Sequence, residues 1–120
     1  MFINHTNHSS QYWSDEQLVA ARQYGDIIDM PFPRIDPLAS TKDIAQLAQD
    51  YAGHIIALHP TAVLCQGEFI YCHALVDRLL AVGITVLAAT SERVVEESYH
   101  DGVNEKLVNF RFVQFREYCR

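Results

Sequence analysis

Three polar segments of this sequence carry the side chains that could do chemistry. His5 to Ser10 offers two imidazoles, an amide and three hydroxyls, and Gln66 to Glu68 offers an amide, a glycine and a carboxylate. Thr90 to Arg93 adds two hydroxyls, a carboxylate and a guanidinium. Together they supply hydrogen-bond donors, acceptors and one positive charge. Such a set suits a nucleotide or a phosphodiester better than an apolar ligand.

Each polar segment follows an apolar run that predicts a buried strand. These runs are Met1–Asn4, Ala62–Cys65 and Ile84–Ala89. A long apolar stretch between Phe69 and Gly83 predicts a helix that joins the last two strands. Such β-α-β units have parallel strands and a right-handed crossover. The polar segments are therefore expected at the carboxyl edge of one sheet, where open α/β folds bind ligands.

Two further helices and one strand are predicted in the first half of the chain. Ser14 begins a helix, with Gln17 in the position that completes a capping box. Asp26–Met30 reads as a strand, and an extended loop follows from Pro31 to Pro37. Ser40 caps a second helix that ends near His59. We expect the strand order 2-1-3-4, with a ligand crevice where strands one and three part.

The tail of the chain predicts a β-hairpin. Two runs rich in Val, Phe and Tyr, Arg93–Tyr99 and Lys106–Arg116, flank Asp101-Gly102, a dipeptide typical of tight hairpin turns. The predicted fold is therefore α/β, a Rossmann-like three-layer fold of four parallel strands with a C-terminal antiparallel β-hairpin. We expect a single domain over residues 1–120, with a parallel core over 1–92 and the hairpin over 93–120.

Composition excludes several classes of protein. The net charge of −6 argues against binding along a nucleic-acid backbone, which needs a basic stripe. The three cysteines show no disulfide spacing, and no apolar run reaches the ~20 residues of a membrane span. The N-terminus lacks the features of a signal peptide, so we expect a cytoplasmic protein without membrane contact. Walker and G-x-G-x-x-G phosphate loops are also absent.

The residues expected to contact a ligand in the crevice are Thr6, Asn7, Ser9, Ser10, Gln66, Gly67, Glu68, Phe69, Thr90 and Ser91. Gly67 allows close approach of the backbone. The same residues have a structural interpretation, in which Gln66–Glu68 is only a strand-to-helix turn and His8 an exposed loop residue. No acidic residue or cysteine has the spacing to complete a metal site with the two loop histidines, so no metal is expected. His73 and Cys65 are interpreted as core residues.

Two motifs in the last half of the chain resemble one family. They are Gln66-Gly67-Glu68-Phe69, directly after the strand that ends in Leu64-Cys65, and the terminal Phe115-Arg116-Glu117-Tyr118. At this separation they are similar to motifs of the small single-domain ring nucleases of the CRISPR-associated Csx series, the CARF-like type numbered twenty. The first half of the chain agrees more loosely.

That resemblance implies a homodimer that binds cyclic oligoadenylate, usually the tetra-adenylate. It also implies cleavage to linear products with a 2′,3′-cyclic phosphate, without metal or cofactor, which switches off a type III CRISPR response. A ribose 2′-hydroxyl would attack its own phosphate, held in line by the protein. His5 or His8 would move the proton, with His5 the more important. Arg93 and backbone N–H groups near Gly67 would stabilise the phosphoryl charge.

Two other functions fit the same sequence. The pocket could capture a cyclic oligonucleotide as a sensor or sponge and release it intact. Alternatively, the chain could be a structural α/β subunit that packs its aromatic tail on a partner or on a second copy. The tail residues concerned are Phe110, Phe112, Phe115 and Tyr118.

Overall fold

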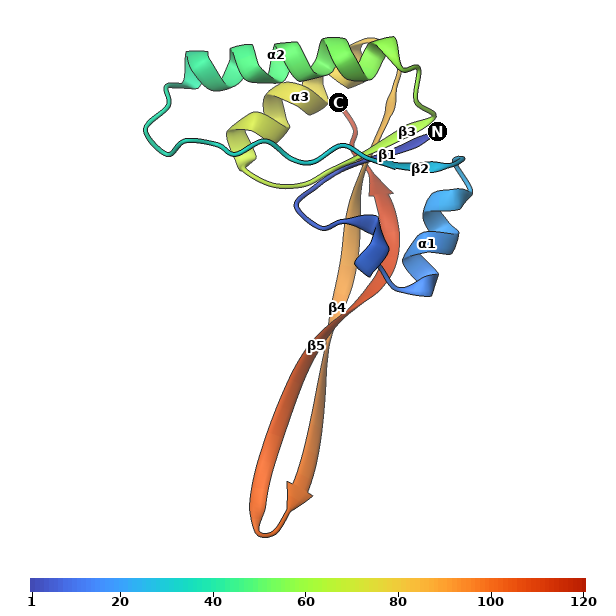
Figure 1. The fold of residues 1–120 in the computed structure, drawn as a ribbon, viewed down its shortest axis with the longest axis vertical. Helices are drawn as coiled ribbons and strands as arrows, with labels where there is room; N and C mark the ends of the chain where they lie inside the picture. Colours follow the sequence, from blue (N-terminus) through green and yellow to red (C-terminus); the bar gives the residue numbers. More distant parts are fainter.

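A computed structural model describes residues 1–120 as a mixed α/β structure around one five-stranded sheet (Figure 1). Its strands are β1 (Phe2–His5), β2 (Ile27–Asp29), β3 (Ala62–Cys65), β4 (Thr85–His100) and β5 (Val103–Glu117). The sheet order is β2-β1-β3-β4-β5. The first four strands pair in parallel, and β5 pairs antiparallel with β4. The predicted order 2-1-3-4 is confirmed.

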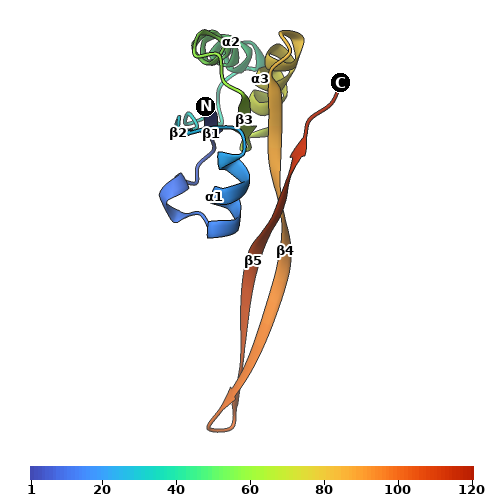
Figure 2. The ribbon, with the colours of Figure 1, turned by 90° about the vertical axis from the view of Figure 1, so that its right-hand side faces the viewer.

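Helices lie on both faces of the sheet. The α-helices are α1 (Asp15–Arg22), α2 (Thr41–Ala57) and α3 (Phe69–Ala81), and a short 3-10 helix, η1 (Ser10–Tyr12), precedes α1. Figures 1 and 2 show α2 and α3 on one face and α1 on the other. The predicted starts of the first two helices are confirmed, because the hydroxyls of Ser14 and Ser40 accept hydrogen bonds from Gln17 N and Asp43 N.

Successive residues of the short buried strands point to opposite faces of the sheet and contribute to two hydrophobic cores. Ile3, Val63 and Val86 pack with α2 and α3 in one core. Phe2 and Leu87 belong to the second core, on the α1 face. The Phe2 ring there lies 5.3 Å from Phe115, 5.9 Å from Tyr24 and 6.1 Å from Trp13, measured between ring centroids. The base of β5 is thereby packed against β1 and the start of α1.

The second half of the chain departs from the prediction at one point. A turn was expected at Thr90–Arg93, followed by a separate hairpin. That turn is wrong, because β4 runs unbroken from Thr85 to His100 and serves both as the fourth parallel strand and as the first arm of the hairpin. The predicted boundary at 92/93 falls inside this strand. The expected tight turn is confirmed at Asp101 and Gly102, whose φ angles of 50° and 79° suit a type I′ turn.

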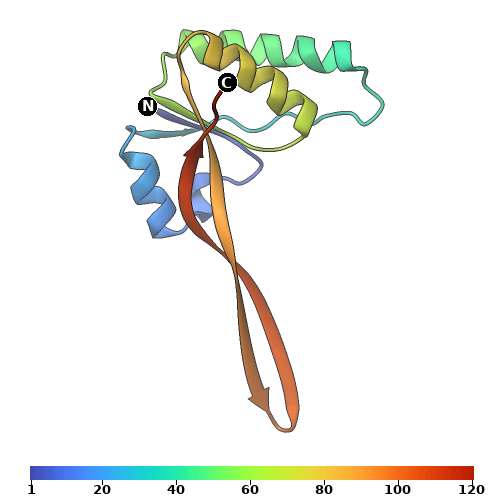
Figure 3. The ribbon, with the colours of Figure 1, turned by 180° about the vertical axis from the view of Figure 1, so that it is seen from behind.

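The long β4–β5 hairpin gives the molecule its elongated shape. The protein measures 57 × 37 × 25 Å along its principal axes. Figure 3 shows the outer part of the hairpin projecting from the sheet and helices as a twisted two-stranded ribbon. No helix of the protein combines the length and the apolar character needed to cross a membrane.

Candidate functional site

A pocket of about 780 Å³ lies at the carboxyl edge of the sheet, on the α1 face. It is bounded by the loop after β1, the start of α1, the turn after β3 and the inner parts of β4 and β5. The lining residues are Thr6, Asn7, His8, Tyr12, Trp13, Ser14, Glu16, Gln17, Leu64, Gln66, Gly67, Ala89, Thr90, Ser91, Phe110, Arg111 and Phe112. The structure thus brings together the three polar segments that the sequence singles out.

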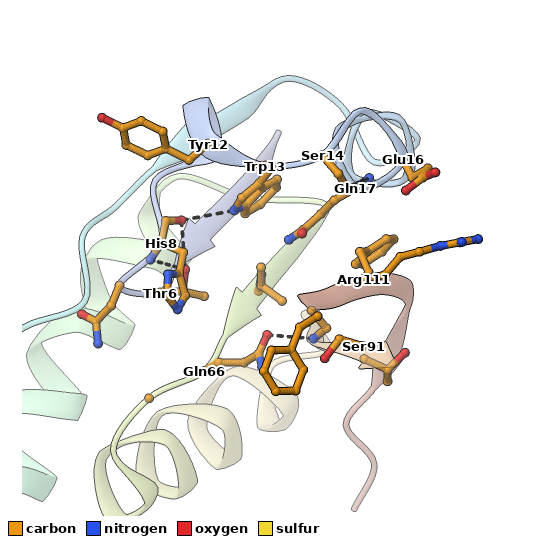
Figure 4. A pocket seen from close by; sticks show the side chains of 17 residues that line it. Thr6, His8, Tyr12, Trp13, Ser14, Glu16, Gln17, Gln66, Ser91 and Arg111 are labelled. Atoms are coloured by element: carbon orange, nitrogen blue, oxygen red, sulfur yellow. Dashed lines mark hydrogen bonds between the residues drawn. The ribbon is translucent and has the colours of Figure 1, made fainter. Parts of the chain in front are cut away.

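Side chains from opposite walls point toward one another in this pocket. Figure 4 shows Trp13 and Gln17 pointing from the α1 side toward Gln66, with His8 to one side. The Gln17 amide makes no hydrogen bond within the protein, although its backbone N–H bonds the Ser14 cap. The reciprocal half of the predicted capping box is therefore absent, and the Gln17 amide is free to bind a ligand.

Buried Asn4 shapes the loop after β1. Its Nδ2 donates to Asp29 Oδ1 and to the backbone oxygen of His8, both at 2.8 Å. Ser9 Oγ and Ser10 Oγ donate to Asp29 Oδ2 at 3.3 and 3.0 Å. Burial would raise the pKa of Asp29, but these hydrogen bonds prevail and lower it. Ser9 and Ser10, predicted to bind ligand, instead hold the loop and do not line the pocket.

His8 is the one imidazole that lines the pocket. Trp13 Nε1 donates to its backbone oxygen at 3.2 Å, and Asn4 donates to the same oxygen. The backbone of His8 is therefore held from two directions, while its exposed imidazole makes no hydrogen bond within the protein. This leaves the imidazole free to exchange a proton with a bound ligand.

His5, predicted to be the more important imidazole, does not lie in the pocket. His5 is fully buried on the α2/α3 face, where Nε2 lies 2.7 Å from Tyr71 Oη and Nδ1 lies 2.7 Å from the Met30 oxygen. Its ring packs on Phe32 and Tyr51. Burial lowers the pKa of His5 in spite of its hydrogen bond to Met30. His5 is thus a hydrogen-bonded core residue, and both of its ring nitrogens are already engaged.

The turn after β3 is built differently from the prediction. The Glu68 carboxylate accepts hydrogen bonds from Ile70 N and Tyr71 N at 3.0 and 2.8 Å, so it caps α3. It thereby occupies two N–H groups at the start of α3, close to Gly67, where backbone N–H groups are predicted to hold a phosphate. The Phe69 side chain is 87% exposed and lies outside the pocket. Gln66 does line the pocket, and its Oε1 accepts a hydrogen bond from Ala89 N at 2.8 Å.

Gly67 is required by packing against the loop before α2. A Cβ atom at this position would lie 2.4 Å from the Phe32 ring, far inside van der Waals contact. Phe32 comes from the Pro31-Phe32-Pro33 segment and is half-buried. The glycine therefore lets the turn after β3 lie directly on this aromatic ring.

We predict that Gly67→Ala destabilises the protein by about 1–3 kcal/mol, the usual cost of forcing extra volume into a packed site. Chemical denaturation measures the change. Gly53→Ala is the matched control, because Gly53 lies inside α2 with no atom within 4 Å of an added Cβ. It should stabilise the protein by about 0.5–1 kcal/mol. Equal stability of Gly67→Ala and the parent would show that Phe32 moves aside freely.

The guanidinium at the pocket also differs from the predicted one. Arg93 does not line the pocket, whereas Arg111 on β5 does. The Arg111 guanidinium points away from the other labelled side chains in Figure 4, and its Nε lies 3.7 Å from Glu92 Oε1. Thr90 lines the pocket, but its hydroxyl bonds the Gln114 backbone at a β-bulge. Ser91 lines it as predicted.

Sequence reasoning missed two groups of lining residues. The first group surrounds the start of α1 and comprises Tyr12, Trp13, Ser14, Glu16 and Gln17. The capping box locates this helix start, and its closeness in sequence to the loop after β1 is the signal that could have placed it at the crevice. The second, Phe110 to Phe112, reaches the pocket through the pairing of β5 with β4. Ser91 pairs with Phe112, and Val113 has no partner, so the bulge sets which β5 side chains face the pocket. No local sequence pattern predicts this register of β5 against β4.

The two buried cysteines lie together in the core and do not line the pocket. Cys65 Sγ and Cys72 Sγ lie 3.6 Å apart in the α2/α3 core. The hydrogen bond to Cys72, together with burial, raises the pKa of the Cys65 thiol, so it is no nucleophile at neutral pH. No group of three or more His, Cys, Asp and Glu residues could hold a metal ion.

Comparison with known protein families identifies the chain by its overall sequence. A family model described as Uncharacterized protein MJ1673 family matches residues 1–116. The chain belongs to this family. The matched region of the MJ1673 family includes every residue that lines the pocket and all of the β4–β5 hairpin except the last residue of β5, Glu117. No curated protein and no solved structure matches the chain.

Proposed function

We propose that the pocket binds cyclic oligoadenylate and that the protein is a ring nuclease on a Rossmann-like fold. The observation that carries this proposal is the convergence of Trp13, Gln17 and Gln66 in a volume typical of ligand pockets, ~300–1,000 Å³. Glutamine amides pair with the N6 and N7 atoms of adenine, and aromatic rings stack on bases. The pocket therefore offers both interactions by which proteins recognise adenine.

His8 supplies the step that would turn binding into cleavage. The attacking group is the 2′-hydroxyl of the ligand, which forms a bond to its own phosphorus as the bond to the 5′-oxygen breaks. The protein has to hold this in-line geometry and move one proton off the 2′-oxygen and another onto the leaving oxygen. Imidazole does this work well near neutral pH. Arg111, the only lysine or arginine of the lining, would have to leave Glu92 to reach the phosphate.

The proposal is tested by incubating the protein with cyclic tri-, tetra- and hexa-adenylate in the presence of a chelator and resolving the products by chromatography. Cleavage of one ring to linear products ending in a 2′,3′-cyclic phosphate is the expected result. Such cleavage would support a role in switching off type III CRISPR signalling. Absence of both binding and cleavage with all three rings would refute the proposal.

A non-catalytic sensor or sponge is the second candidate. It is favoured by the position of the charged groups, because His5 is engaged in the core, Arg93 is outside the pocket and Glu68 caps α3. Of the three residues predicted to be catalytic, only His8 then remains at the ligand. The same incubation separates the two functions, since a sensor would retain the ring and release it unaltered.

We predict that Gln17→Ala weakens adenylate binding by about 3–10-fold, the equivalent of one neutral hydrogen bond. The free Gln17 amide points into the pocket, so its loss removes a ligand contact without breaking one within the protein. Isothermal titration calorimetry measures the change. Gln23→Ala is the control, because Gln23 follows the other end of α1 and lies outside the pocket. Equal affinities of the two variants would remove Gln17 from the site.

A further inference from the structure

The outer part of the hairpin, from Ser91 to Phe112, has two faces of different character. In an antiparallel pair, opposite residues share a face and successive residues alternate. One face, here called the aromatic face, carries the paired positions Ser91–Phe112, Arg93–Phe110, Val95–Val108, Glu97–Lys106 and Tyr99–Asn104. The other, called the charged face, carries Glu92–Arg111, Val94–Asn109, Glu96–Leu107, Ser98–Glu105 and His100–Val103.

The aromatic face continues the hydrophobic core of the α1 face but lacks a covering layer. The Phe112 ring contacts Phe115, which contacts Phe2 in that core, with centroid separations of 4.9 and 5.3 Å. Farther out, Phe110 is 72% exposed. Val95, Val108 and Tyr99 are exposed too. Exposed apolar side chains that gather on one face, here Phe110, Val95 and Val108, are typical of a binding surface.

A two-stranded ribbon is at best marginally stable alone in water, and both of its edges are unpaired. The projecting ribbon contacts no other element of the chain beyond its base (Figures 2 and 3). A partner that covered the aromatic face would stabilise the ribbon by burying Phe110 and the two valines. The ribbon carries charges of both signs, so it does not fit a nucleic-acid backbone.

We propose that the aromatic face pairs with the aromatic face of a second copy of this chain, the two ribbons running antiparallel about a two-fold axis at Val95 and Val108. In a two-fold contact, residue i of one copy meets residue j of the other and the reverse. This axis places Arg93 opposite Glu97 of the second copy, because the two lie equally far from Val95 along β4. The charges on the face are therefore self-complementary.

The same axis also places complementary residues of β5 opposite each other in the two copies. Along β5, Phe110 and Lys106 lie equally far from Val108, so each phenyl ring meets the lysine of the second copy and can bind its ammonium group. Phe110 also lines the pocket. Lys106 of the second copy thus comes to the rim of a pocket whose own chain contributes only one cation. This surface and its occupant do not depend on which ligand the pocket takes.

The size of the contact sets the expected affinity. The five paired positions span ~26 Å between their ends at ~3.3 Å per residue, but the contact is only two strands wide. The buried surface falls at the small end of specific interfaces, below ~1,200 Å² in total. A reversible dimer in the micromolar range is therefore expected rather than a permanent one.

Sedimentation velocity between roughly 1 and 200 µM, concentrations that bracket such an affinity, tests the proposal. The parent should shift from monomer to dimer across this range. Val108→Lys should weaken the dimer by about 100-fold, because it places two additional charges in a small apolar contact. Leu107→Lys, the adjacent residue on the charged face, should dimerise like the parent. A parent that stays monomeric, or equal effects of the two substitutions, would overturn the proposal.

Cysteine cross-linking tests the position of the axis without weakening the ribbon. In a Cys119→Ser background, which removes the exposed native thiol, Val95→Cys should form an intermolecular disulfide on air oxidation, since O₂ accepts the two electrons and two protons of the thiols. Val94→Cys, on the charged face, should not cross-link. Efficient cross-linking of Val94→Cys, or none of Val95→Cys, would show that another surface joins the copies.

Discussion

The His8→Ala variant is expected to cleave cyclic tetra-adenylate roughly 10²–10⁴-fold more slowly than the parent, the range that a positioned general acid or base contributes. His8 carries the only imidazole that lines the pocket, and that imidazole has no hydrogen bond within the protein. Its loss removes the proposed proton carrier and leaves the binding contacts of Trp13, Gln17 and Gln66 in place. Single-turnover cleavage with protein in excess over ring measures the effect.

Two controls make this result specific. Affinity for the ring, measured by calorimetry, should change by no more than a few-fold, because the removed group acts on the proton rather than on the base. His54→Ala, an exposed histidine of α2 on the opposite face of the sheet, should cleave like the parent. If His8→Ala cleaves at the parent rate, His8 is not the proton carrier. A parent that binds the ring without cutting it would establish the sensor instead.

The His5→Ala variant should lose about 3–5 kcal/mol of stability, from an empty volume in the core together with unpaired buried groups. The His5 imidazole fills the space between Tyr71 and Met30 and bonds both of them. Its removal leaves a buried hydroxyl and a backbone oxygen without a partner. Because domains are stable by only about 5–15 kcal/mol, much of the stability would be lost. Urea denaturation measures the change.

Cleavage by the folded fraction of His5→Ala should stay within a few-fold of the parent, because His5 lies on the other face of the sheet from the pocket. Tyr71→Phe provides a graded control. It removes only the hydroxyl that pairs with His5 Nε2 and should cost about 1–3 kcal/mol. Undiminished stability of His5→Ala combined with lost cleavage would restore the original prediction of a catalytic His5.

The stability of the parent should also depend on pH through His5. Burial lowers the pKa of His5 from its ordinary value of 6.5. Below pH 6.5 the unfolded chain therefore binds a proton that the folded protein excludes, so the free energy of unfolding falls as the pH is lowered. The fall ends at the lowered pKa, where both states are protonated. Urea denaturation at a series of pH values measures the effect. The difference in the free energy of unfolding between the parent and His5→Ala should be independent of pH above pH 6.5 and should shrink as the pH falls below it.

Local patterns sufficed for much of the fold. Ser14 and Ser40 mark helix starts because a hydroxyl there satisfies a free backbone N–H, whatever the rest of the chain does. Asp101-Gly102 marks the hairpin tip because few residues accept a positive φ. The strand order followed from β-α-β connections, which almost always have one hand. These short-range rules also placed the three polar segments at one edge of the sheet, where the pocket lies.

The direction of individual side chains was not predictable in the same way. β1 is buried on both faces, so its residues show no alternation of polar and apolar character that would tell the face of Asn4 from the face of His5. The result is that the imidazole of His5 enters the α2/α3 core while His8, three residues later, reaches the pocket. Likewise, a one-residue change in strand register exchanges the two faces. The bulge at Val113 therefore decides that Phe110 and Phe112 share the pocket side.

The sequence by itself determined which segments come together, because turn chemistry, helix caps and chain connectivity act between neighbouring residues. Only the tertiary structure decided which side chains are free to act there. The Glu68 carboxylate caps α3, and the hydroxyls of Ser9 and Ser10 bond Asp29. Arg93 lies on the ribbon, outside the pocket. Those assignments depend on hydrogen bonds and packing between residues far apart in the chain, which no local pattern contains.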